Sequence, residues 1–98
     1  MRVEQVEIYS DQTNRAVLRH PGRRFPGILI QGDNLYSLCQ RADLICLETE
    51  GAVGDETYQD INELRNALRS YLAHYKTVLS EHVISMPFSE QPLTPRRL

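Results

Sequence analysis

The chain has 98 residues, of which 41% are apolar and 24% are charged, and its formal net charge is -2. This length favours one small domain with a single hydrophobic core and excludes a second core. No run approaches the roughly 20 apolar residues needed to cross a bilayer, and the N-terminal residues alternate in polarity where a signal peptide would be continuously apolar. We therefore expect a cytoplasmic protein that does not contact a membrane.

The first third of the chain predicts β-structure. Residues 2–9 alternate polar and apolar side chains with the period of two that a strand with one wet face requires. A cluster of turn formers follows at 10–14, and alternation resumes at 15–19. Residues 13–19 are therefore a second strand or, alternatively, a short helix. The β-branched, apolar segment at 27–31 predicts a third strand.

A first helix is predicted over residues 34–49, with Asp33 as its N-cap. Apolar side chains recur there at three- and four-residue steps, which indicates a face packed on the sheet. This stripe comprises Leu35, Leu38, Cys39, Ala42, Ile45 and Cys46. Leu44 and Leu47 make the end of the helix apolar on the opposite side too.

A second, antiparallel helix starts at Thr57, or at Asp55 in an alternative capping assignment, and its apolar stripe continues until Pro87. We thus predict an α+β domain over residues 1–86, with two or three antiparallel strands followed by two antiparallel helices, the second long. The proline-rich tail, residues 87–98, is expected to be extended or disordered.

The second helix, about 40 Å long, outruns the first, which is about 24 Å long. The apolar overhang must be covered by the sheet, by the tail or by a second chain. We predict a two-fold homodimer, because small domains often complete their cores by association. The predicted interface comprises Leu44, Leu47, Tyr71, Tyr75 and Val78.

An arginine-rich loop, RHPGRRFPG at residues 19–27, carries two Pro-Gly pairs that each fit a type II turn. Residues 15–24 hold four arginines, one histidine and no acid. This block is a candidate anion-binding surface for nucleic acid or a phosphate ligand, or else a solvated surface paired with the chain's own acids. Its members are Arg15, Arg19, His20, Arg23 and Arg24. Phe25 offers either a stacking platform for a base or a plug for the edge of the core.

An acidic block follows between residues 43 and 63, where seven carboxylates occur without a lysine or arginine between them. This segregation favours an acidic contact surface for a basic protein partner. The members of the block are Asp43, Glu48, Glu50, Asp55, Glu56, Asp60 and Glu63.

No residue pattern indicates catalysis, a metal or a cofactor. Cys39 and Cys46 lie about 10 Å apart along one helix, too far for a disulfide, and the histidines fall in no zinc-type spacing with them. We interpret both as thiols of the core. An enzyme using Cys39 or His20 is the least favoured of three hypotheses.

Residues 7–33, with their PGR.FPG loop and QGD helix start, resemble a short bacterial family of uncharacterised proteins. This resemblance lies in the first third of the chain and implies no catalytic residues. The size, acidity and element order are also similar to immunity proteins of bacterial toxin systems. We therefore predict a non-enzymatic protein-binding domain, of immunity type or a regulatory partner of a basic protein, with nucleic-acid or phosphate-ligand binding through the arginine-rich loop as the alternative.

Overall fold

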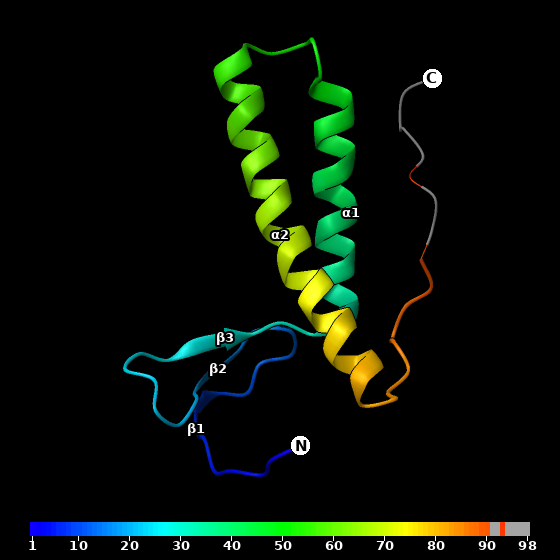
Figure 1. The fold of residues 1–98 in the computed structure, drawn as a ribbon. Coiled ribbons are helices and arrows are strands. Elements are labelled where there is room, and N and C mark those ends of the chain that lie inside the picture. The colour runs from blue at the N-terminus through cyan, green and yellow to red at the C-terminus, as the bar shows by residue number, and fades with distance from the viewer. Residues whose placement is uncertain (91–92, 94–98) are drawn as a thin grey trace. The chain divides into compact units, whose positions relative to one another are not determined.

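A computed structural model describes residues 1–90 and Leu93 of the chain (Figure 1). Three strands precede two helices, which confirms the predicted α+β class. The elements are β1 (Glu7–Ser10), β2 (Ala16–Arg19), β3 (Gly27–Leu29), α1 (Gly32–Thr49) and α2 (Asp55–Glu81). They fall into two compact units, a sheet unit of residues 1–31 and a helical unit from Gly32 onward, and the single domain over residues 1–86 stays a prediction.

The sheet unit is a three-stranded antiparallel meander in the order β1-β2-β3. Residues 16–19 pair with both neighbours, so the alternative of a short helix over residues 13–19 is wrong. A tight turn between β1 and β2 excludes that helix, because Asn14 has a left-handed φ of 62° and the Arg15 amide donates to the Gln12 carbonyl at 3.1 Å.

The two Pro-Gly pairs differ in conformation. Gly22 has a φ of 83°, and the Arg23 amide donates to the His20 carbonyl at 3.0 Å, as the predicted type II turn requires. The second predicted turn is wrong, because Gly27 has no positive φ and pairs with Leu18 as the first residue of β3. Ladder pairing therefore holds the second pair extended and leaves one tight turn in the loop.

The helical unit is built on an antiparallel hairpin of α1 and α2. One contact joins Cys46 to Ile61 near the connecting loop. Another joins Cys39 to Leu68, one heptad further from that loop on each helix. Cys39 and Cys46, two members of the stripe that we expected on the sheet, thus contact α2. Beyond these pairs, Leu35 and Leu72 complete a small buried cluster with Cys39.

The starts of both helices differ from the prediction. α1 begins at Gly32, so Asp33 is inside the first turn, where its Oδ1 accepts from the Asn34 amide at 2.9 Å. A Cβ at residue 32 would overlap the end of the Tyr75 ring, so any residue other than glycine must displace that ring. α2 begins at Asp55 behind Gly54, which supplies no side-chain cap, so neither predicted cap is correct.

α2 also ends earlier than its apolar stripe suggested. The helix stops at Glu81, and Val83 adopts a left-handed φ of 54°. The Ile84 amide then donates to the Leu79 carbonyl at 2.9 Å, which closes the end of the helix in the manner of a Schellman motif. A reversal of the backbone, and not Pro87, therefore ends α2.

No helix in the described part of the chain is long and apolar enough to span a bilayer.

Candidate functional site

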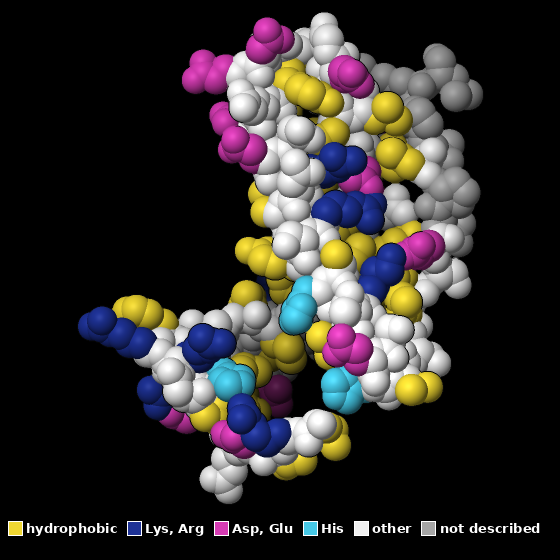
Figure 2. All heavy atoms as spheres, in the orientation of Figure 1, with side chains coloured by type: hydrophobic (Ala, Val, Ile, Leu, Met, Phe, Trp, Pro, Cys, Tyr) yellow, Lys and Arg dark blue, Asp and Glu magenta, His cyan; other side chains and the backbone are white. Residues whose placement is uncertain are grey.

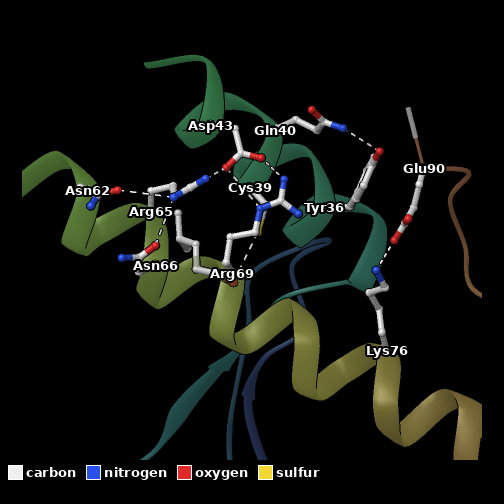
Figure 3. Close-up of polar contacts among 11 residues, drawn as sticks. Tyr36, Cys39, Gln40, Asp43, Asn62, Arg65, Asn66, Arg69, Lys76 and Glu90 are labelled. Atoms are coloured by element: carbon white, nitrogen blue, oxygen red, sulfur yellow. Dashed lines mark hydrogen bonds and ion pairs between the residues drawn. The ribbon is translucent and has the colours of Figure 1, made fainter. Parts of the chain in front are cut away.

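The centre of the hairpin is an ion-pair triad (Figure 3). Asp43 of α1 is buried and accepts from Arg65 Nε at 2.9 Å and from Arg69 Nε at 3.2 Å, both on α2, and it forms a second contact with the Arg69 guanidinium. The same interaction joins the two helices and neutralises the carboxylate. Asp43 is therefore a structural residue, and its assignment to the acidic contact surface was wrong.

Cys39 lies beside this triad and is completely buried. Its Sγ donates to the Leu68 carbonyl at 3.3 Å. Burial raises the pKa of the Cys39 thiol, and the charge of Arg69 offsets this only in part. A buried, neutral thiol is a poor nucleophile, which does not favour the hypothesis of an enzyme using Cys39.

We expect Cys39 to react with a thiol reagent at least tenfold more slowly in the native protein than in urea-unfolded protein, because reaction requires local opening. The measurement is the rate of labelling by 5,5′-dithiobis(2-nitrobenzoate), with Cys46→Ala used to isolate the Cys39 signal. A native rate equal to the unfolded rate would contradict the burial of this thiol.

Five of the seven predicted carboxylates form what we call the acidic tip, at the end of the hairpin where α1 connects to α2 (Figure 2). All five are exposed, and none has an ion pair within the described residues. Glu48 is half-buried and is not counted among them. The acidic tip comprises Glu50, Asp55, Glu56, Asp60 and Glu63.

A cavity of about 210 Å³ opens beside the acidic tip. Leu47 and Tyr58 provide apolar surface in it, and Glu50 and Asn62 provide oxygen acceptors. Asp43 and Arg65 also line it as an ion pair, and Asp43 is shared with Arg69. The cavity therefore has the chemistry to receive a guanidinium or ammonium group, with an apolar stem against Leu47 and Tyr58.

The arginine-rich loop of the sheet unit is less uniformly basic than its sequence. Arg19 pairs with Glu7, which lies directly opposite it across β1 and β2. Arg15 precedes β2, and Arg23 and Arg24 follow it. The strand between them is about 13 Å long. The five predicted anion ligands are therefore not brought together.

Two exposed arginines and one aromatic ring remain at the loop. The guanidinium of Arg24 lies 5.3 Å from the centroid of the Phe25 ring, a cation–π contact. A shallow cavity of about 170 Å³ beside it is lined by His20, Arg23, Phe25 and Ile28 among others. Phe25 is exposed, so within the described residues it does not plug a core.

The residues predicted for a dimer interface do not form one patch. Tyr75 packs against the Leu35, Cys39 and Leu72 cluster of its own chain. Leu47 is exposed near the acidic tip and lines the same cavity as Tyr58. Tyr71 is also exposed, but it lies about 20 Å along α2 from Tyr58. Homodimerisation remains a prediction that light scattering at micromolar concentration tests.

Among the residues that the structure describes, no group of three histidine, cysteine or acidic side chains is placed to hold a metal ion.

A three-stranded sheet followed by a helical hairpin, with arginines on the loop of one unit and carboxylates at the tip of the other, defines a small α+β protein with segregated surface charge. The chain belongs to DUF6959, a family of unknown function whose model matches residues 1–88. The match extends beyond the PGR.FPG and QGD segments through both helices to Phe88. Comparison with curated proteins and with solved structures finds no match.

Proposed function

We propose that this protein is a non-enzymatic binding domain that docks a basic protein partner at the acidic tip, as an immunity-type or regulatory protein would. The observation that carries this proposal is the set of five exposed carboxylates that form no ion pair with any residue described by the structure, beside a cavity with apolar walls. Like charges gathered on one helix end repel one another, and a cationic partner relieves that repulsion.

The cavity distinguishes the acidic tip from a merely solvated surface. Interfaces concentrate their binding energy in a few anchors, and arginine is enriched among them. An arginine inserted beside Glu50 and Asn62 gains charge-assisted hydrogen bonds, while Leu47 and Tyr58 shield them from water. The surrounding carboxylates accelerate encounter with the partner, and that contribution weakens as salt concentration rises.

The test compares two variants with the same loss of negative charge. Glu50→Gln/Asp60→Asn/Glu63→Gln changes the acidic tip and spares Asp55 and Glu56, which stabilise the first turn of α2. Glu4→Gln/Asp11→Asn/Glu81→Gln changes exposed acids elsewhere. Each tagged protein is used to capture partners from lysate at low and physiological salt, and captured proteins are quantified by mass spectrometry.

We expect the tip variant to lose a basic partner by about tenfold or more, while the control variant retains it. Identical captured proteins for both variants would refute docking at the acidic tip.

A second candidate function, binding of nucleic acid or a phosphate ligand, is favoured by the contact between Arg24 and Phe25. An exposed ring with a guanidinium beside it offers a base both stacking and backbone neutralisation. Anisotropy of labelled single- and double-stranded DNA and RNA tests this, with Arg23→Ser/Arg24→Ser compared to Arg2→Ser/Arg41→Ser as a charge-matched control. No binding at about 100 μM protein in low salt would retire this candidate.

A further inference from the structure

A groove on the helical hairpin already holds a segment of the chain itself. Residues 84–90 follow the reversal at Val83 and run beside α1 (Figure 1). Phe88 stacks on Tyr36 of α1, with the ring centroids 4.4 Å apart and the planes 7° from parallel. The same ring packs against the buried Leu35, Cys39 and Leu72 cluster.

The groove also recognises a carboxylate two residues beyond this aromatic ring. Glu90 forms an ion pair with Lys76 of α2 (Figure 3). This pair lines a cavity of about 160 Å³ together with Arg69. Tyr36 and Gln40 line the same cavity from α1. Gln40 Nε2 donates to the Tyr36 hydroxyl at 2.6 Å, which holds the aromatic platform in place.

The groove therefore offers three features at fixed spacing: a flat aromatic ring, an apolar floor and a cation. Arg69 adds positive charge to the same cavity, although Asp43 holds its guanidinium. A segment with an aromatic side chain followed two residues later by a carboxylate matches all three features.

The segment that occupies the groove is not held firmly. The side chains of its ion pair are exposed to 34% in Lys76 and 59% in Glu90, so water competes for both charges. Its entry requires a left-handed backbone at Val83, a conformation that β-branched residues disfavour.

We propose that this groove is a docking site for an extended segment of another protein, with an aromatic residue followed two positions later by an acidic one, and that residues 84–90 are its displaceable internal occupant. The partner segment is acidic, and the site lies near the start of α1 and the end of α2, away from the connecting loop, so this interaction is separate from that of the acidic tip. Only molecules whose groove is not occupied by the internal segment can bind the partner. The apparent affinity is therefore reduced in proportion to the fraction of molecules with an open groove.

The probe is a fluorescein-labelled peptide with the sequence of residues 84–90, ISMPFSE, titrated into full-length protein and followed by anisotropy. Phe88→Ala/Glu90→Gln disables the internal occupant and is expected to bind the peptide about tenfold more tightly than the unmodified protein. Val83→Gly relaxes the turn, favours the closed groove and is expected to bind more weakly than the unmodified protein.

Two controls assign binding to the groove. In the Phe88→Ala/Glu90→Gln background, Tyr36→Ala is expected to abolish binding, whereas Tyr71→Ala, which removes an exposed tyrosine of α2, is expected to leave it unchanged. Peptides with phenylalanine replaced by alanine, or glutamate by glutamine, are expected to bind at least tenfold more weakly.

The proposal is overturned if no variant binds the peptide up to 1 mM, or if Tyr36→Ala and Tyr71→Ala have equal effects. Circular dichroism checks that each variant is folded, and Glu90→Gln alone, which alters only an exposed pair, carries the test if the double variant unfolds. A dimer that forms in the unmodified protein and dissociates in Phe88→Ala would instead assign the groove to the same segment of a second copy, and would also overturn the proposal.

Discussion

Replacing Leu72 with alanine is expected to lower the free energy of unfolding by about 3 kcal/mol. Leu72 is 1% exposed and packs against Leu35 and Cys39 across the hairpin. The described part of the chain buries only five apolar side chains, and among these only Leu72 and Cys39 are less than 2% exposed, so few neighbours are available to fill the resulting cavity. Urea unfolding followed by circular dichroism at 222 nm measures the loss.

Leu64→Ala is the matched control for this prediction. Leu64 is on the same helix but is 63% exposed, so its truncation is expected to change the free energy of unfolding by no more than about 0.5 kcal/mol. Equal losses for the two variants would mean that Leu72 does not lie in the core.

Asp43→Ala is expected to lower the free energy of unfolding by about 2 kcal/mol, because it leaves Arg65 and Arg69 without their counter-ion. The side chains of these arginines are 39% and 37% exposed and can turn to water, which keeps the loss below that of a fully buried pair. Arg65→Ala is expected to cost less, because Asp43 then retains Arg69. The measurement is urea unfolding of Asp43→Ala, of Arg65→Ala and of the double variant Asp43→Ala/Arg65→Ala.

Two further variants separate charge from packing in the triad. Asp43→Leu/Arg65→Met/Arg69→Met removes all three charges together and is expected to remain within about 1 kcal/mol of the unmodified protein. Asp60→Asn removes an exposed carboxylate and is expected to have almost no effect. A neutral outcome for Asp43→Ala would contradict a structural role for the triad.

The ion pair of Glu90 adds a pH dependence. Its hydrogen bond with Lys76, followed by the charge of Lys76, lowers the pKa of the Glu90 carboxyl below its ordinary value. Because the folded pKa is the lower one, the stabilisation is complete above the ordinary carboxyl pKa and is lost as pH falls through the lowered value. We expect the Phe88 amide resonance to shift in that acidic range, and no shift in Glu90→Gln.

The order and type of the elements were predictable from local patterns. Alternating side chains identified β1 and, with a short helix as the alternative, β2. β-branched apolar residues identified β3, and three- and four-residue steps identified both helices. The helix boundaries were harder to predict from the sequence because they depend on distant contacts or on backbone strain. Gly32 starts α1 where the Tyr75 ring leaves no room for a Cβ, and Val83 reverses the chain against the preference of its own side chain.

The candidate sites were only partly predictable, because charges were assessed along the chain and not across it. Asp43 belonged to an acidic block in sequence, but the hairpin places it against Arg65 and Arg69. Two arginines four residues apart on one helix face were a detectable signal for such a partner. The ion pair between Arg19 and Glu7 depends on strand register, and the stacking of Phe88 on Tyr36 joins residues with no shared local pattern.

The register of the hairpin has a consequence for the order of folding. Its cross-helix contacts span 15 residues at Cys46 and Ile61, 22 at Asp43 and Arg65, and 29 at Cys39 and Leu68. Once one pair has formed, only roughly seven residues of free chain lie between it and the next pair. The entropy of loop closure is therefore lost in small steps. The hairpin can therefore close progressively from its connecting loop, with the ion-pair triad forming before the Leu72 cluster.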